Sequence, residues 1–238
     1  MKSKKLKKWT TLLTCATALT VMTACSQSGS QSTGTTSSTT SKTSAVTATT
    51  SKKTNKNNSN YFTSKDSDTS YNESSATKIK LSGSSADVSG DGASLSGSTV
   101  TISKAGTYVI SGKSDGVQIK VDAGDSDDVH IVLDGATMTN TNAAINATKA
   151  GHVYLTLKDG TTNTLSDSSS NSDEDADAVI FSKGDLTING SGTLNIDAKK
   201  NNGIKANDSL HMTGGTYKIS SVVMPSMSMM NSISQEQL

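Results

Sequence analysis

The chain has no arginine, and its 238 residues include only one proline and two cysteines. The absence of arginine removes the side chain best suited to binding carboxylate or phosphate groups through two parallel hydrogen bonds. Both cysteines, Cys15 and Cys25, lie close to the N-terminus, so no pair is left to form disulfides in the rest of the chain. Aromatic residues make up 3% of the sequence, too few for a row of exposed rings of the kind that binds crystalline sugar. The chain also lacks the Gly-x-Ser-x-Gly, His-Glu-x-x-His and phosphate-binding glycine motifs.

The first 24 residues have the pattern of an export signal. Five lysines within residues 1–8 precede a short apolar stretch, residues 12–24, which ends in Met-Thr-Ala directly before Cys25. This stretch is too short for a membrane-spanning helix. Small residues before a cysteine are typical of bacterial lipoproteins. We therefore expect lipidation of Cys25 and anchoring at the extracellular face of a bacterial cell membrane. The alternative is an ordinary cleaved signal followed by an unmodified cysteine.

The composition changes sharply near residue 76. Residues 25–76 are mostly Ser, Thr, Lys and Asn, and this predicts a disordered tether because so few apolar side chains cannot offset chain entropy. Residues 1–76 carry 10 lysines and 3 acidic residues, a net charge of +7. Residues 77–220 carry 12 lysines and 17 acidic residues, a net charge of −5. An acidic folded part argues against nucleic acid as a partner.

The second half of the chain contains a repeat. Residues 185–196 reappear as residues 209–219, so that Leu186 and Leu210 are 24 residues apart. Each copy alternates apolar and polar residues and turns at a glycine, which is typical of short β-strands joined by tight corners. A repeat of this length predicts a parallel solenoid, in which stacked turns bury apolar side chains that no single turn could bury. An antiparallel sandwich is the alternative that also fits many short strands.

Ten short segments are expected to be strands. Residues 105–112, which lie before the repeat, are expected to belong to a hairpin-rich β cap over the N-terminal end of the solenoid. The ten expected strands are residues 79–81, 100–102, 108–110, 117–121, 129–133, 153–157, 179–181, 186–188, 194–196 and 217–219.

The C-terminal tail, residues 222–238, breaks the repeat abruptly. Reading the methionine-rich stretch one base earlier is compatible with a further repeat unit that contains an Asp-Asp-Glu corner. We therefore predict that residues 77–221 form a C-terminally truncated domain and that the tail results from a frameshift. The coding DNA beyond Ser221 tests this directly.

An acidic segment is the sharpest chemical feature of the sequence. Neighbouring carboxylates repel one another unless a cation joins them, and oxygen ligands of this kind suit Ca²⁺. The expected metal ligands in this segment are Asp173, Glu174, Asp175 and Asp177. Corner residues of the repeat that could supplement them are Asp185, Asn202 and Asp208. The alternative is a solvated acidic loop that binds no metal.

Two other groups of residues are interpreted as structural. The acidic turn at residues 122–128 holds four aspartates between two expected strands, where hydrogen bonds to the turn backbone explain them. The alternative at this turn is a second metal site. The three histidines, His130, His152 and His211, fall at outward positions of expected strands and lack metal-ligand spacing. We expect them to be surface residues, or residues whose side chains stack on equivalent side chains of the neighbouring strands.

Four short segments carry a resemblance to a known family: residues 81–85, 105–112, 163–167 and 181–192. The most specific of them is residues 181–192, Phe-Ser-Lys-Gly-Asp-Leu-Thr-Ile-Asn-Gly-Ser-Gly. In these segments residues 78–220 resemble bacterial carbohydrate-binding-domain lipoproteins of the clostridial type that binds cellulose and polygalacturonate. The resemblance implies a right-handed parallel β-helix similar to polysaccharide lyases, displayed at the cell surface. It also implies Ca²⁺ and acidic plant-wall sugars as ligands, bound without cleavage. The implied Ca²⁺ ligands are Asp173, Asp175, Asp177 and Asp185.

We therefore expect an all-β chain folded as a right-handed parallel β-helix with an N-terminal β cap. We expect a non-catalytic surface lipoprotein that binds polysaccharide, a polyuronate or a cellulose-like polymer, with Ca²⁺ shared between protein and sugar carboxylates. Lysines near the repeated corners could add contacts to uronate groups: Lys183, Lys199, Lys200 and Lys205. Asn202 and Asp208, at the same corners, are further expected carbohydrate-binding residues. One alternative is a Ca²⁺-dependent polysaccharide lyase with Lys205 as its base. Another is a structural adhesin that binds a protein or the cell wall.

Overall fold

β-Strands account for nearly all the regular structure in the computed structural model, which describes residues 44–49 and 61–222. One short 3₁₀ helix, η1 (Ser64–Ser67), is the only helix in these two segments, and it is far too short to cross a bilayer. The prediction of an all-β chain is thereby confirmed. The expected signal peptide with Cys25, and the expected frameshifted tail apart from Val222, lie outside the described residues.

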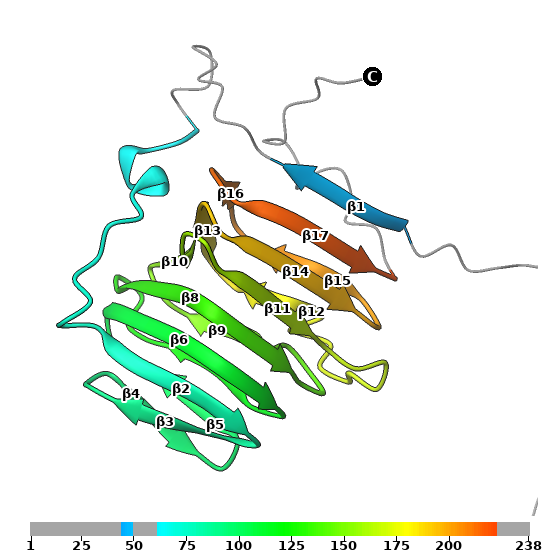
Figure 1. Cartoon of the computed structure of the whole chain (residues 1–238), viewed down its shortest axis with the longest axis horizontal. Helices are drawn as coiled ribbons and strands as arrows, with labels where there is room; N and C mark the ends of the chain where they lie inside the picture. Colours follow the sequence, from blue (N-terminus) through cyan, green and yellow to red (C-terminus); the bar gives the residue numbers. More distant parts are fainter. Residues whose placement is uncertain (1–43, 50–60, 223–238) are drawn as a thin grey trace, which may run out of the picture. The chain divides into compact units, whose positions relative to one another are not determined.

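The strands belong to two sheets (Figure 1). The smaller sheet contains, in spatial order, β15 (Asn202–Ala206), β12 (Ala178–Ser182), β9 (Ile145–Lys149), β7 (Gln118–Asp122), β5 (Thr99–Ile102) and β4 (Ala93–Ser96). The larger sheet has eleven strands: β1 (Ser44–Thr49), β2 (Thr77–Gly83), β3 (Ser85–Ser89), β6 (Gly106–Asp115), β8 (Asp128–Thr139), β10 (His152–Leu157), β11 (Thr162–Ser166), β13 (Asp185–Gly190), β14 (Thr193–Ala198), β16 (Leu210–Met212) and β17 (Thr216–Ser221).

The strand register reproduces the sequence repeat. β12 pairs with β15 and β13 pairs with β16, both in parallel, and Leu186 lies opposite Leu210 at the predicted offset of 24 residues. β14 pairs in parallel with β17 at an offset of 23, from Thr193 to Thr216, because the second glycine corner is one residue shorter. The strands β9, β10 and β11 pair with β12, β13 and β14 in the same way. Equivalent strands of successive repeats are therefore direct neighbours.

The N-terminal end differs from its expected form. β6, which contains most of the expected cap segment, pairs in parallel with both β2 and β8. The hairpins lie earlier in the chain, where β2 pairs antiparallel with β3 and β4 pairs antiparallel with β5. Each hairpin turns through a Gly-Ser pair whose glycine, Gly83 or Gly97, has a φ of 59°. A positive φ at the first of two turn residues matches the right-handed twist of the paired strands, which explains why the hairpins form there.

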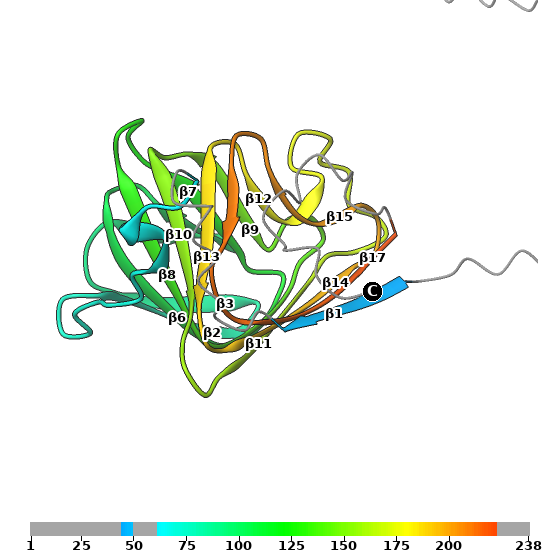
Figure 2. The ribbon, with the colours of Figure 1, turned by 90° about the horizontal axis from the view of Figure 1, so that it is seen from above.

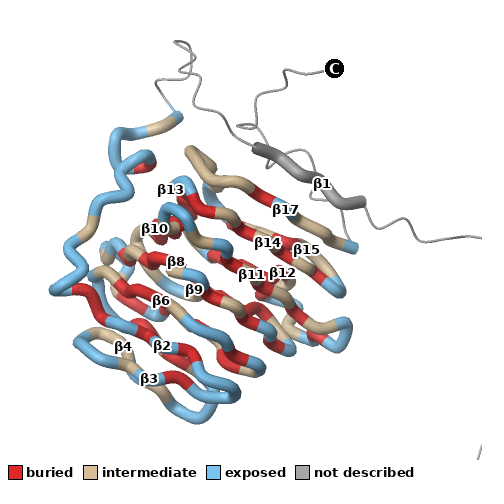
Figure 3. Tube along the Cα trace, viewed as in Figure 1, coloured by how far each residue is buried: buried red, intermediate tan, exposed pale blue. Residues whose placement is uncertain are grey.

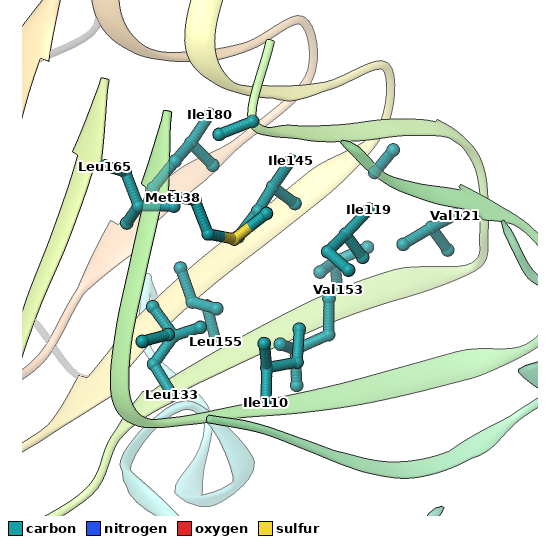
Figure 4. Packing of buried hydrophobic residues seen from close by; sticks show 14 of the residues in the cluster. Ile110, Ile119, Val121, Leu133, Met138, Ile145, Val153, Leu155, Leu165 and Ile180 are labelled. Carbon is teal, nitrogen blue, oxygen red and sulfur yellow. The ribbon is translucent and has the colours of Figure 1, made fainter. Parts of the chain in front are cut away.

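A continuous apolar core lies between the sheets. Alternate residues are buried along strands such as β7 and β14, whereas β10, β12 and β13 are buried along nearly their whole length (Figure 3). Residues at equivalent positions stack, as Ile119, Ile145 and Ile180 do in the smaller sheet. In Figure 4, Met138 and Leu165 of the larger sheet point toward these isoleucines. Complete burial of each such side chain is worth about 1.5–3 kcal/mol, so the stack as a whole holds the corners in place.

The segment before β2 departs from the prediction of a disordered tether. Residues 61–76 are described in the structure, include η1, and form hydrogen bonds with strands more than 100 residues away, such as the bond from Thr187 to Asp66. The predicted boundary at residue 77 is therefore corrected to about residue 61. Sequence composition missed this because the segment is mostly polar and docks through hydrogen bonds, with Phe62 and Tyr71 as its aromatic contacts to the sheet. Farther upstream, β1 pairs antiparallel with β17.

Candidate functional site

A pocket of about 380 Å³ lies on the outer face of the smaller sheet. Its floor comes from outward positions of β9 and β12, and one wall comes from the loop between β11 and β12, residues 167–177. Its lining combines one aromatic ring, two carboxylates, a lysine and neutral polar side chains. The lining residues are Asn146, Thr148, Asp173, Asp175, Ala176, Phe181, Lys183 and Asn207.

Register explains why Asn146 and Phe181 meet on this face. Ile145 pairs with Ile180 and both point into the core, so the next residues, Asn146 and Phe181, pair on the outer side. Phe181 packs in a small separate cluster with Ala143, Ala176 and Ala178. Phe181 is only 4% exposed, so most of the ring is covered and a small part of it lines the pocket.

Asn146 is only 8% exposed, and its side-chain oxygen accepts no hydrogen bond from the described residues. A buried amide oxygen without a partner costs stability, because it has lost its hydrogen bonds to water. Because Asn146 lines the pocket, a ligand that donated a hydrogen bond to this oxygen would remove that cost. Sequence analysis missed Asn146, and the signal that could have revealed it was the alignment of Ile145-Asn146 with Ile180-Phe181.

The acidic loop is held by bonds within itself and to the next turn. Asp167, which is 2% exposed, accepts hydrogen bonds from the backbone N–H of Lys199 at 2.6 Å and from Asn171 at 3.1 Å. Asp173 accepts the backbone N–H groups of Asp175 and Ala176 at 3.1 and 2.9 Å. These bonds fix the loop conformation that places Asp173 and Asp175 at the pocket. The role of Asp167 as an anchor was not predicted.

The structure brings together only part of the expected metal set. Asp173 and Asp175 line the pocket, whereas Glu174 is exposed and is not part of the lining. Asp177 forms an ion pair with Lys205, with 2.6 Å between Oδ1 and Nζ. Asp185 begins β13 in the other sheet, where it accepts the N–H of Ser209 at 3.0 Å. In the part of the chain that the structure describes, no three His, Cys, Asp or Glu side chains are arranged to hold a metal ion.

Most of the lysines expected to contact a ligand are engaged within the protein. Lys183 lines the pocket. Lys199 pairs with Asp197, and Lys200 donates to the carbonyl of Asn171. Lys205 lies 5.8 Å from the centre of the Phe181 ring in addition to its ion pair. Of the two corner residues, Asn202 donates to Asp177 and Asp208 is not part of the lining.

In the other acidic turn, only Asp127 of the four aspartates accepts a hydrogen bond from the backbone as expected, whereas the other three pair with lysines. In the turn, Asp122 pairs with Lys120, Asp125 with Lys149 and Asp128 with Lys65, while Asp127 accepts the N–H of Gly124. His130, His152 and His211 all lie at outward positions of the larger sheet, where burial lowers the pKa of His130 and His152.

Comparison with known proteins adds three findings. Residues 96–234 match the family model described as carbohydrate-binding domain-containing protein. A carbohydrate-binding domain-containing protein of Acetivibrio thermocellus is 39% identical over 126 residues, which are 50% of this chain and 44% of that protein. A solved structure described as the polysaccharide lyase-like protein from C. thermocellum, a gadolinium derivative, is 36% identical with a TM-score of 0.58 over 60% of each chain. This chain thus covers less than two thirds of either relative.

Proposed function

Because this chain belongs to the carbohydrate-binding domain-containing protein family, we propose that the pocket on the smaller sheet binds polysaccharide and does not cleave it. The observation that carries the proposal is the combination of the Phe181 ring with the unpartnered oxygen of Asn146 in one pocket. An aromatic ring packs against the apolar C–H face of a sugar, and the amide oxygen accepts a hydrogen bond from a sugar hydroxyl. Lys183 supplies a positive charge for an acidic sugar.

The repeat suggests how a polymer would lie. We propose that the stacked strands continue as a right-handed parallel β-helix, for which the parallel register and the likeness to a lyase-like protein are the support. Outward residues of β9 and β12 and the corner after β15 would then contact successive sugars of a chain running across the strands. A linear polysaccharide fits such a surface better than a single small sugar does.

Calcium is a further part of the proposal. The donors around the pocket, the two carboxylates with the amide and hydroxyl oxygens of Asn146 and Thr148, are all of the hard oxygen type that Ca²⁺ prefers. Asp173 and Asp175 would hold the ion, and carboxylates of a polyuronate would complete its coordination. Ca²⁺ would supply positive charge between an acidic protein face and an acidic polymer, which otherwise repel each other. The sequence of residues 1–25 supports display of this domain as a lipoprotein on the outside of the cell.

Cleavage of the polymer by a lyase reaction is the second candidate, favoured by the description of the solved relative as lyase-like. Lyase chemistry needs a base that removes a proton beside the sugar carboxylate. Lys205 was the expected base, but its ammonium group donates to Asp177 at 2.6 Å. This ammonium group is thus engaged with Asp177 and lies outside the pocket lining, which favours binding over cleavage.

Binding of polygalacturonate measured by calorimetry tests the function. Replacing Phe181 with alanine should weaken binding at least tenfold, because it removes the aromatic part of the pocket lining and the support that the ring gives to the acidic loop through Ala176. The control is Tyr61→Ala, which removes a ring that is 72% exposed and outside the pocket. The double change Asp173→Asn and Asp175→Asn should abolish the Ca²⁺ dependence of binding, whereas Asp87→Asn on exposed β3 should not.

Two results would contradict the proposal. Equal binding by the Phe181 and Tyr61 variants would show that the pocket is not the site. Steady formation of unsaturated uronide, followed by its ultraviolet absorbance, would show that the protein is a lyase.

A further inference from the structure

A second polar face lies on the outer side of β8, β10, β13 and β16. Register aligns His130, Tyr154, Thr187 and His211 in one row across these four strands. Thr156 and Asn189 pair in the neighbouring row. A segment that we call the strap, residues 61–75 with η1 at its centre, runs across this face (Figure 2).

The strap presents a buried carboxylate to this face. Asp66, which is 1% exposed, accepts a hydrogen bond from the Thr187 hydroxyl at 2.6 Å, and the same oxygen lies 3.1 Å from Nδ1 of His211. Its other oxygen is held inside the strap by the N–H and hydroxyl of Thr63, at 2.7 and 2.9 Å. Oδ2 of Asp66 therefore stabilises the conformation of the strap, and Oδ1 contacts Thr187 and His211 on the sheet.

The backbone of the strap is held in a similar way. The carbonyl of Asp66 accepts hydrogen bonds from Asn189 at 3.2 Å and from Thr213 at 2.6 Å. Asn189 also donates to the carbonyl of Asp68 at 3.0 Å. Thr187, Asn189, His211 and Thr213 thus all direct a hydrogen-bond donor or a ring nitrogen at oxygen atoms of the strap. Such a face suits an oxygen-rich, negatively charged ligand.

Aromatic rings flank these donors. His152 and Tyr154 are stacked, with 4.1 Å between ring centres and 12° between planes, and the ammonium group of Lys65 lies 4.9 Å from the centre of Tyr154. Tyr71 meets His130 edge-on at 6.0 Å. If the strap left, the sheet would present hydroxyl and amide donors beside a flat ring. That is the combination which recognises the carboxylate and the C–H face of a uronate sugar.

Several features make the strap displaceable. It contains few apolar residues, and its attachment depends on hydrogen bonds, which exchange readily for bonds to water or to a ligand. Of its three aromatic residues, Tyr61 is 72% exposed, Phe62 meets the His211 ring with 5.2 Å between ring centres, and Tyr71 packs against a small apolar cluster.

By contrast, Thr187 and Asn189 on the sheet are 0% and 1% exposed. Within the sheet, the Thr187 hydroxyl also bonds to His152 at 2.8 Å, and the Asn189 side-chain oxygen accepts a hydrogen bond from Thr156 at 2.6 Å. The strap, or a substitute, is needed to accept hydrogen bonds from the Asn189 amide N–H groups and from the Thr187 hydroxyl.

We propose that this face is a second carbohydrate site, specific for a uronate carboxylate, and that the strap occupies it with the carboxylate of Asp66 until an oligouronate displaces it. The site lies on a different sheet from the pocket described above and does not depend on it. Its donors are hydroxyl, amide and imidazole groups rather than carboxylates, so binding here needs no Ca²⁺.

Calorimetry with trigalacturonate in EDTA, on the full-length chain, tests the proposal. EDTA removes Ca²⁺-dependent binding at the pocket, so the two sites report separately. Asp66→Ala should increase affinity at least tenfold by removing the internal competitor. The control Asp68→Ala, on an exposed aspartate of the strap whose carboxylate bonds only to Ser70, should behave as the wild type does. Adding Thr187→Val to Asp66→Ala should remove the gain, and Thr187→Ser should retain it.

Hydrogen exchange completes the test and requires no variant. In the wild-type protein, increasing trigalacturonate should raise exchange of residues 61–75 in a saturable way, while neutral galactotriose should leave it unchanged. The proposal is overturned if the strap stays protected in Asp66→Ala, or if it is released without a gain in affinity. It is also overturned if galactotriose binds equally well, or if only a synthetic peptide of residues 61–75 binds the open face.

Discussion

Asp66 is a carboxylate that stays charged although it is buried. Burial alone would raise its pKa, but hydrogen bonds from Thr187, from Thr63 and from His211 lower the pKa from 3.8 to about 2. A carboxylate with a lower pKa in the folded state stabilises the fold above the unfolded value and loses that contribution as the pH falls through the folded one. We therefore expect about 2 kcal/mol of unfolding free energy to be lost between about pH 4 and pH 2.

Urea denaturation across this pH range measures the effect. Asp66→Asn should have a flatter pH profile than the wild type, because the amide does not titrate. Asp87→Asn, which removes one exposed negative charge, is the control for a general change in net charge. Parallel profiles for the wild type and Asp66→Asn would show that this carboxylate does not control acid stability.

At the same scale, the sequence located part of the pocket and none of the strap site. Asp173, Asp175 and Lys183 were found because charge clustering is visible without a structure. Asn146 was missed because one amide in a strand resembles any other polar residue until the register places it beside Phe181. Asp66 was missed because its partners are more than 100 residues away in the chain, and composition says nothing about such pairings.

Glycine corners show how closely the strands of neighbouring turns approach. Gly190 ends β13 with a φ of 96°, and a Cβ at this position would collide with the carbonyl oxygen of Leu157 on β10. Gly160 has a similar φ of 70°, but a Cβ there would meet nothing within 4 Å. We expect Gly160→Ala to cost about 1 kcal/mol for its backbone conformation alone. Gly190→Ala should cost about 3 kcal/mol or more, because it adds a clash with the backbone.

Chemical denaturation of the two variants provides the comparison. Each variant serves as the control for the other, since both place alanine at a positive φ. Equal losses of unfolding free energy would mean that the backbone around Gly190 can move away from Leu157 at little cost. The close contact between these two strands would then not be required for stability.

Elements were predictable where a strand carries its own apolar pattern. All ten expected segments lie in strands of the structure, apart from Val117 at one end. The strands that were not among them include β9, Ile-Asn-Ala-Thr-Lys, and β15, Asn-Gly-Ile-Lys-Ala, in which alanine or glycine replaces larger apolar residues. Parallel pairing, with β7 and β12 for β9 and with β12 for β15, stabilises such segments more than their own propensity does. Sequence alone does not reveal such strands, because their pairing partners belong to neighbouring turns that are distant in the chain.

For the whole molecule, charge determines how a polyuronate can be bound. The 17 acidic residues against 12 lysines in residues 77–220 oppose an acidic polymer, and the pocket itself contains two carboxylates. With fewer than three acidic or histidine ligands assembled in the described part of the chain, Ca²⁺ alone should bind weakly. The polymer alone should also bind the pocket weakly. Each ligand should therefore increase the affinity for the other, and by linkage the two increases are equal.

Thermal unfolding reveals this coupling. Ca²⁺ alone and polygalacturonate alone should each raise Tm by about 1 °C or less. Both together, at about 100 times the apparent Kd, should add about 2.7 kcal/mol, which for a domain of this size corresponds to a shift of about 5–10 °C. The double change Asp173→Asn and Asp175→Asn should remove the joint shift, whereas Asp87→Asn should preserve it. A full shift with Ca²⁺ alone would mean that the protein holds a complete metal site, and cation-shared recognition would then be wrong.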